Sequence, residues 1–525
     1  MKKILDITKV AAGILSGVMT VSVLLCSCSD EALNEVNKDY DHPKSVESKY
    51  IVADIIVRTA TNNIGGDFNT YLSTYVEHEV GIDNQLWRAE MRQGEPTLAS
   101  AYNNTWSSLY ITLKDARIAI AQCSEGGTDE GNFVTRGIAE VLAAYNSALI
   151  ADMFGDAPWS EASQINPDGT PQNMNPKMDK QEDIYKGINA YLDAAIADLQ
   201  RTDVSAIGSY DFLYSGDKGK WLKLAYGLKA RYTLRLLARA SNKDAELDKV
   251  LDYVSKSFAS VRDQAAFDIY DANNLNPLFD FQWSRDGLAA SESIAEKFIE
   301  RDDPRLRRVF VDADWEQVEG PDADNYFLAP NGDPEQLRYY YNTSAFVYSQ
   351  EAPTMYMSYH ELMFIKAEAL VRKGQLEDAE DALREAVLAA IVNCEVGVDA
   401  AENAPAVTYY GGLYMFTDPI EDDEAEEYFD EVVKPLFDEN PLKEVMIQKY
   451  LGFFGASGES TETYNDIRRM KALGESFVEL KNTNPFPLRL PYGNSDTTTN
   501  PEVKNAYGNG QYVYTEPVWW AGGSR

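Results

Sequence analysis

The most regular hydrophobic pattern in the chain runs from Met357 to Val392 and predicts two helices joined by a short turn. Apolar residues recur at helical spacing in its first half and give that helix one broad apolar face. Gly374 follows two basic residues, which is typical of the end of a helix. The second half opens with acidic residues, which suit the positive end of a helix dipole. The residues that we predict to be buried between the two helices are Leu362, Met363, Ile365, Ala367, Ala369, Leu370, Leu376, Ala379, Leu383, Ala386 and Val387.

A second helical pair with a related pattern lies earlier in the chain. It opens with Trp221 and Leu224 and continues with a second apolar set between Leu247 and Phe258. Both pairs follow the spacing of large and small residues found in tetratricopeptide (TPR) repeats, although the later pair lacks the usual terminal proline. An ordinary helical hairpin is the alternative for either pair alone. Their recurrence predicts a scaffold of TPR-like helix pairs, an architecture that more often binds than catalyses.

The rest of the chain alternates between helical and irregular stretches. Residues 83–96 are expected to form a loop, and residues 272–353 to be irregular apart from a helix at 291–301. The residues after about 455 are expected to be rich in turns. The sequence therefore predicts one large, mainly α-helical domain over 49–525, with a large loop-rich half and few short strands. Further helices are predicted over residues 100–121, 133–154, 184–199, 221–239, 424–437 and 441–450.

The N-terminal segment combines a basic start with an apolar run from Val10 to Leu25, which predicts a secretory signal. A signal-anchor helix is the alternative, because the run is just long enough to span a bilayer. The segment ends in a Leu-Cys-Ser-Cys sequence that resembles a bacterial lipobox, which implies a signal peptide over 1–27 and lipidation of Cys28. Acidic residues follow at once, as in lipoproteins displayed on the outer surface of some Gram-negative cells. Residues 28–48 are then expected to form a polar tether.

Charge and cysteine content exclude several classes of partner. The chain carries 84 acidic and 48 basic residues, and its formal net charge is −36. This balance argues against nucleic acid and against an anionic bilayer surface as electrostatic partners. Beyond the N-terminal segment there are only Cys123 and Cys394, and whether they form a disulfide stays open. No cysteine or histidine spacing suggests zinc. His360 and Glu361 begin like the helix of a zinc protease, but the second histidine of that motif is missing.

No arrangement of residues predicts catalysis. The sequence has neither a phosphate-binding loop nor a complete nucleophile elbow, and its many acidic residues make some carboxylate pairs inevitable. Asp312, Asp314, Asp322 and Asp324 offer oxygen ligands for calcium, yet they lack the glycine and the terminal glutamate of an EF-hand loop. A solvated acidic loop is the expected state of these residues. We therefore expect a protein that is not an enzyme and that needs no cofactor or metal.

Several local sequences, taken together and in order, resemble one family: they are 152–159, 221–231, 358–369, 448–450, 462–469 and 489–492. With the lipobox, they make the chain similar to the SusD/RagB-type (SusD-like) nutrient-binding outer-membrane lipoproteins. The resemblance implies a TPR-like scaffold with an irregular half, and a lipid anchor in the outer membrane facing the extracellular side. It also implies a SusC-type TonB-dependent transporter as partner, to which members pass oligosaccharides or, in some cases, peptides.

Most residues of these motifs are expected to be structural. Trp221 is expected in the core rather than on a ligand platform. Arg468 and Arg469 lie close to Glu462 and Asp466 in sequence, and we expect both arginines to hold the C-terminal region through ion pairs. The motifs therefore indicate the fold without locating the binding site.

The ligand-binding residues are predicted from composition. Sugar rings offer flat faces for aromatic stacking, and their hydroxyls suit amide, carboxylate and guanidinium partners. The sequence predicts an oligosaccharide-binding surface on the loops. A peptide receptor of the same fold, a glycoside hydrolase on a helical scaffold and a purely structural surface protein are the alternatives. The candidates are Asp83, Asn84, Trp87, Arg88 and Arg92 in one loop, and Trp283, Trp315 and Tyr340 in the irregular half.

Overall fold

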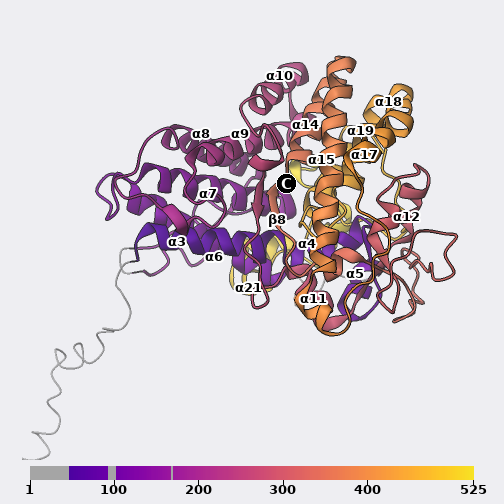
Figure 1. Ribbon diagram of the computed structural model, residues 1–525. Helices are drawn as coiled ribbons and strands as arrows, with labels where there is room; N and C mark the ends of the chain where they lie inside the picture. Colours follow the sequence, from indigo (N-terminus) through magenta and orange to yellow (C-terminus); the bar gives the residue numbers. More distant parts are fainter. Residues whose placement is uncertain (1–45, 93–101, 167–168) are drawn as a thin grey trace, which may run out of the picture. The chain divides into compact units, whose positions relative to one another are not determined.

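The computed structural model describes residues 46–92, 102–166 and 169–525, of which Ser48–Arg525 form one compact unit. Helices dominate this unit (Figure 1), and the predicted mainly α-helical fold is confirmed. Cys28, the predicted signal segment and nearly all of the predicted tether lie outside the described residues. Within the described part, no helix is both long enough and apolar enough to cross a membrane.

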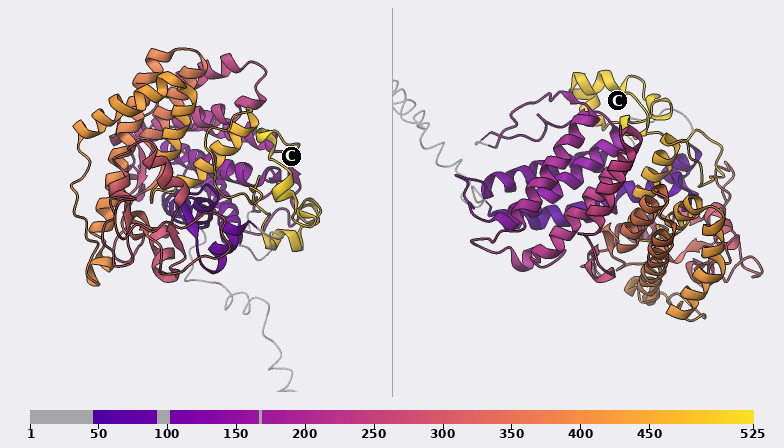
Figure 2. Two further views of the ribbon diagram at one scale, coloured as in Figure 1. Left: turned by 90° about the vertical axis from the view of Figure 1, so that its right-hand side faces the viewer. Right: turned by 90° about the horizontal axis from the view of Figure 1, so that it is seen from above.

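One part of the unit is a series of long helices, each packed on the next. They are α3 (Ser48–Arg58), α6 (Asn103–Cys123), α7 (Phe133–Phe154), α8 (Gln181–Asp198), α9 (Lys218–Arg235), α10 (Lys243–Val254), α14 (Tyr359–Arg372) and α15 (Leu376–Glu402). In this order, each helix contacts the one that follows it. Figure 2 shows the long helices of the N-terminal part, coloured indigo to magenta, lying side by side. Packing between successive helices is what a TPR-like scaffold predicts.

The irregular half contains short helices and short strands. Each strand pairs antiparallel with one partner, and the longest described strand has four residues. The helices of this half are α11 (Pro277–Arg285), α12 (Glu292–Ile299) and α13 (Leu306–Val309). The strand pairs are β1 (Glu79–Gly81) with β5 (Leu288–Ala290), β2 (Ala157–Pro158) with β3 (Met178–Asp179), β4 (Ala265–Phe267) with β8 (Thr354–Met357), and β6 (Phe310–Val311) with β7 (Thr343–Ser344).

The predicted central hairpin is present as α14 and α15. The hydroxyl of Ser358 caps α14 by accepting a hydrogen bond from the Glu361 N–H (3.1 Å), and Gly374 forms the turn with a φ of 73°. The residues predicted to be buried in it are buried except Leu376, which is 45% exposed because it is the first residue of α15, at the turn. The second helix is longer than predicted and continues to Glu402.

Several helices form where the sequence predicted loops or turns, and three of them have eight or more residues. These three are α5 (Asn84–Met91), α11 and α20 (Ser460–Ala472). The first two are too short for a clear hydrophobic period. For α11 the prediction overlooked a start signal, because Asn276 caps the helix and Pro277 is its first residue. The third buries mainly polar and charged residues, so it has no apolar stripe to recognise.

Buried ion pairs join α20 to the scaffold helices. Each of the two Arg469 Nη atoms lies 2.6 Å from a carboxylate oxygen of Glu368, and Nη2 also lies 3.0 Å from Asp466. The predicted ion-pair role is therefore confirmed for Arg469. It is wrong for Arg468, which forms no ion pair with the described residues and donates instead to carbonyl and amide oxygens. Trp221 is fully buried, as predicted.

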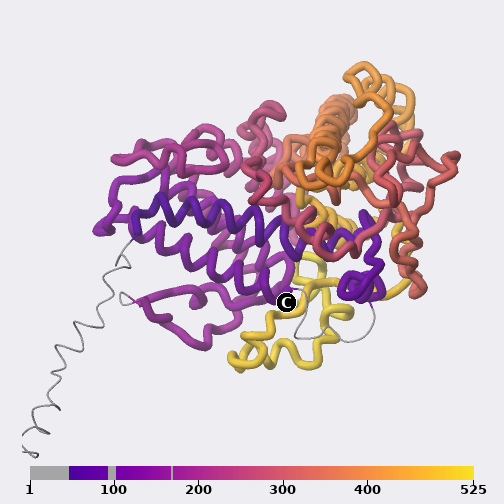
Figure 3. The backbone as a smooth tube through the Cα atoms, turned by 60° about the horizontal axis from the view of Figure 1, so that its bottom comes forward, coloured from indigo at the N-terminus to yellow at the C-terminus, as the bar shows by residue number. Residues whose placement is uncertain are grey.

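The C-terminal residues return to the first helices (Figure 3). Asn494 donates its backbone N–H to the Asn103 side chain (2.7 Å), and Asn500 donates its side-chain amide to the Pro176 carbonyl (2.8 Å). The remaining helices are α4 (Asp67–Tyr75), α16 (Pro405–Tyr409), α17 (Asp422–Tyr428), α18 (Lys434–Glu439), α19 (Pro441–Gly452), α21 (Asn494–Thr499), α22 (Pro501–Tyr507) and α23 (Tyr512–Thr515).

Candidate functional site

The last turn of α11 places Trp283 at the surface. Phe279 precedes it by one helical turn, so the two rings lie one above the other on the same face. Their centroids are 5.3 Å apart and their planes differ by 18°. Phe279 is fully buried while Trp283 is 37% exposed. The buried ring therefore fixes the orientation of the exposed one.

Trp315 lies beside Trp283 on a turn from another part of the chain. The two ring centroids are 6.0 Å apart with an angle of 32°, and buried Tyr348 packs on the other side of Trp315 at 5.6 Å. The Asp312 side chain shapes the turn by accepting hydrogen bonds from the backbone N–H groups of Asp314 and Glu316, both at 2.9 Å. Two of the predicted ligand residues thus come together.

Tyr409 and Tyr410 complete this set of rings, and the prediction did not include them. Tyr410 lies 5.9 Å from Trp283 and 5.0 Å from Tyr409, and the two tyrosines are 68% and 82% exposed. A hydrogen bond from the Tyr414 N–H to the Trp315 carbonyl (2.9 Å) holds their segment beside the turn. The signal available in the sequence was a pair of tyrosines followed by two glycines. We call Trp283, Trp315, Tyr409 and Tyr410 the aromatic platform.

Arg338 connects three segments at the edge of the platform, and it was also missed by the prediction. Its Nη1 lies 3.2 Å from a carboxylate oxygen of Asp83, and its Nη2 donates to the Arg285 carbonyl at the end of α11 (2.9 Å). Its guanidinium lies 4.8 Å from the ring centroid of Tyr339. Burial raises the pKa of the neighbouring Asp286 carboxyl, and the Arg338 charge opposes that shift.

The predicted residues at 83–88 lie on and before α5. Asn84 and Arg88 are exposed and hydrogen-bonded to each other at 3.1 Å, one helical turn apart. Trp87 is half-buried and donates its indole N–H to the Pro334 carbonyl (3.3 Å). Together with Asp83, they bring polar groups to the segment that carries Arg338.

Tyr340 belongs to a second group of rings. Its centroid lies 5.1 Å from Phe327 and 5.4 Å from Tyr341, and it is 50% exposed. Arg338, two residues earlier in the chain, joins this segment to the end of α11. Tyr340 therefore lies in the segment that borders the platform.

Arg92 lies inside the protein. It ends α5 in the left-handed conformation, with a φ of 48°. Its Nη2 donates to the Tyr75 carbonyl (2.7 Å) and lies 3.8 Å from the Glu77 carboxylate. Burial lowers the pKa of its guanidinium, and the charge of Glu77 opposes this. Arg92 therefore joins the end of α5 to the end of α4 in the interior of the protein and does not lie on the exposed surface.

The described residues contain no group of three or more metal-ligating side chains arranged to hold an ion. His360 lies 3.1 Å from Glu459, and both are buried, so this pair belongs to the core. Cys123 and Cys394 are buried free thiols. The rings of the platform and the polar groups at its edge supply stacking and hydrogen bonding.

Comparisons with known proteins agree with this architecture. A family model, SusD-like_2, described as "Starch-binding associating with outer membrane", matches residues 46–492. No curated protein matches the chain. A solved SusD/RagB family protein from Bacteroides thetaiotaomicron is 56% identical, with a TM-score of 0.86 over 92% of this chain and 100% of that one.

More distant structures share the fold. A chitin-binding protein is 20% identical, with a TM-score of 0.67 over 89% of this chain and 99% of its own. A SusD homologue from Bacteroides fragilis is 19% identical, with a TM-score of 0.70 over 91% of this chain and 100% of that one.

Proposed function

The chain belongs to the SusD-like family of outer-membrane nutrient-binding proteins, and from this premise we propose that it binds oligosaccharides on the aromatic platform and passes them to a SusC-type TonB-dependent transporter. Lipidation of Cys28 would anchor it in the outer membrane, facing the extracellular side. Cys28→Ala tests the anchor, because the protein should then lose its acyl group and leave the membrane.

The observation that carries the proposal is the pairing of Trp283 with Trp315. Exposed rings whose orientation is fixed by buried ones offer flat apolar faces at little cost in conformational entropy. Sugar rings present flat faces of this kind. Tyr410 extends the same surface.

Polar groups at the edge suit the hydroxyls of a sugar. Arg338 and Arg88 supply donors, and Asp83 and Asn84 supply acceptors within the same region. A few stacking contacts and hydrogen bonds bind weakly, so we expect dissociation constants from about 10 µM to about 1 mM. Weak binding is compatible with release to a transporter, and we expect binding without turnover.

Calorimetry tests the platform. The wild type and the variants Trp283→Ala and Tyr410→Ala are titrated with the best glycan found on an array. We expect each variant to bind about two- to twelve-fold more weakly, because a stacking contact contributes about 0.5–1.5 kcal/mol. Tyr210→Ala is the matched control, since Tyr210 is a partly exposed ring that pairs with Tyr50 on α3.

Three results would decide against the proposal. Unchanged affinity in both folded platform variants would move the site elsewhere. Failure to bind any glycan, together with binding of peptides, would favour the peptide receptor. Release of reducing ends from a polysaccharide would instead indicate a glycoside hydrolase.

A further inference from the structure

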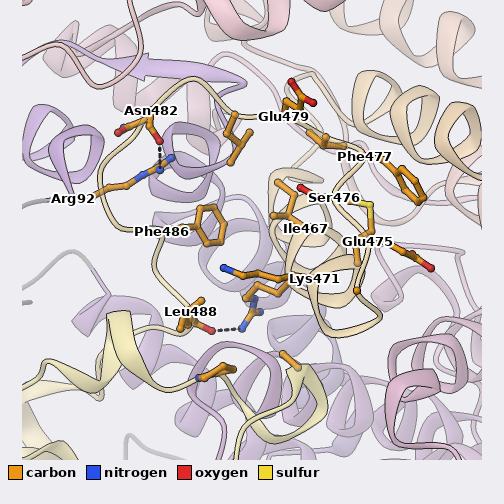
Figure 4. A pocket seen from close by; sticks show the side chains of 17 residues that line it. Arg92, Ile467, Lys471, Glu475, Ser476, Phe477, Glu479, Asn482, Phe486 and Leu488 are labelled. Carbon is orange, nitrogen blue, oxygen red and sulfur yellow. Dashed lines mark hydrogen bonds between the residues drawn. The ribbon is translucent and has the colours of Figure 1, made fainter.

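A pocket of about 730 Å³ lies between α20 and the segment that follows it (Figure 4). The volume is in the range of small-molecule sites. Ile467, Phe477, Phe486 and Leu488 form apolar walls, and no residue of the aromatic platform lines it. The pocket is therefore separate from the proposed glycan surface.

Three cationic side chains line this pocket in a chain whose net charge is −36. They are Arg92, Arg468 and Lys471. Figure 4 shows Lys471 extending towards Phe486 across the pocket. Lys471 is exposed and makes no ion pair with the described residues.

Arg468 is buried and forms no ion pair with the described residues, because the nearby carboxylate of Asp152 pairs with Arg235 instead (3.2 Å). Its Nη1 donates to the carbonyls of Asp152 (2.9 Å) and Leu488 (3.2 Å), and its guanidinium lies over the rings of Tyr464 and Trp520. Its Nε has no hydrogen-bond partner. A buried cation that is paired only with dipoles and ring faces is costly, so a negative charge nearby would stabilise it.

The acidic residues of the pocket do not supply this charge. Glu475 is engaged by Arg372, with both carboxylate oxygens at 2.7 Å from the guanidinium. Glu479 is exposed. Arg92, whose Nε is also unpartnered, has Glu77 at 3.8 Å, but Glu77 also accepts hydrogen bonds from the backbone N–H groups of Lys481 and Asn482.

We propose that this pocket binds a small organic anion with an apolar body, such as a carboxylate on a hydrocarbon chain or ring. The acidic group of this anion lies near the ammonium group of Lys471, where Arg468 also makes the electrostatic potential positive. The apolar body packs between Phe486 and the side chains of α20. The anion gives Lys471 and Arg468, neither of which forms an ion pair with the described residues, a partner of opposite charge.

A matched pair of fluorescent probes tests the charge requirement. Anilinonaphthalene sulfonate carries an anionic group, and N-phenyl-naphthylamine has the same rings without it. We expect the wild type to bind the sulfonate more tightly, and decanoate to displace it better than decanol does. Equal affinity for the two probes would overturn the proposal.

Three variants test whether the probes bind in this pocket. Lys471→Met keeps the apolar stem and removes the charge, so sulfonate affinity should fall about three- to ten-fold while affinity for the neutral probe stays the same. Lys504→Met removes an exposed lysine of α22 and should change neither. Trp283→Ala should also leave sulfonate binding unchanged, which separates the pocket from the platform. The proposal fails if Lys471→Met binds the sulfonate like the wild type, or if Trp283→Ala abolishes binding.

Discussion

Trp315 holds its ring beside Trp283 in an uncommon backbone conformation. Its φ is 65°, which is unfavourable for a bulky side chain. Such a conformation costs on the order of 1–3 kcal/mol and persists where surrounding contacts impose it. Here the contacts are the hydrogen bonds of the Asp312 side chain and the packing against Tyr348. Placement of the ring thus depends on a residue that need not touch the ligand.

Asp312→Ala should therefore weaken glycan binding indirectly. The variant loses two backbone hydrogen bonds and one from the Asn325 side chain, so we expect a loss of about 1–3 kcal/mol in stability and a several-fold fall in affinity. Asp314→Ala is the control, because Asp314 is exposed in the same turn. Denaturant unfolding and calorimetry give the two quantities. Equal affinity in Asp312→Ala and the wild type would show that the turn does not position the platform.

The residues of the site could be predicted only in part. Composition singled out Trp283 and Trp315, because aromatic residues in segments without a helical period cannot all be assigned to a core face. It did not predict the contact of Trp283 with Tyr410, since that contact depends on a distant segment held by a hydrogen bond from Tyr414 to Trp315. Nor did it distinguish Arg88, which is exposed, from Arg92, which is buried. Whether these residues bind ligand stays a prediction.

At the scale of elements, the kind of side chain that a helix buries decides whether its sequence reveals it. The hairpin of α14 and α15 buries apolar residues, so its period was evident. Gly397 shows how closely α15 packs on the segment that precedes the hairpin, because an added Cβ would lie 2.9 Å from the Phe346 ring. By contrast, α20 buries Glu462, Asp466 and Arg469, and polar residues carry no hydrophobic period. Such a helix becomes recognisable only once its charged partners on other helices are known.

Replacing Arg469 should strongly destabilise the protein. Arg469→Met leaves Glu368 and Asp466 with one fewer cation in a buried site, and we expect a loss of about 3–5 kcal/mol in the free energy of unfolding. Lys471→Met, at an exposed position of the same helix, should change it by less than about 0.5 kcal/mol. Urea unfolding followed by circular dichroism measures both. Similar midpoints for the two variants would mean that these ion pairs do not hold α20 in place.

At the scale of the whole molecule, buried titratable groups make stability depend on pH. Burial raises the pKa of Glu79 and of Glu140 to about 8, and that of Glu90 to about 7. The folded protein therefore keeps protons near neutral pH that the unfolded chain releases above a pKa of about 4.5. His78 acts in the opposite sense, because burial lowers its pKa to about 3. In the unfolded chain a histidine takes up its proton as the pH falls through about 6.5. The contribution of neutral His78 to the free energy of unfolding is therefore lost as the pH falls through and below that value.

We expect the melting temperature to fall as pH rises from about 6.5 to about 8. At the lower edge of this window His78 of the unfolded chain is half protonated, and it becomes neutral above about pH 7.5. This single group opposes the trend only there, while across the window the folded state binds more protons than the unfolded state at the raised carboxyls. Each such group lowers the free energy of unfolding by up to about 1.4 kcal/mol per pH unit. Glu79→Gln can still accept the hydrogen bond from the Ser344 hydroxyl but does not titrate, so its melting temperature should fall less steeply. The exposed Glu351→Gln is the control and should follow the wild type. Scanning calorimetry at closely spaced pH values makes the comparison, and a wild-type melting temperature that rises over this window would mean that these carboxyls are ionised in the folded protein.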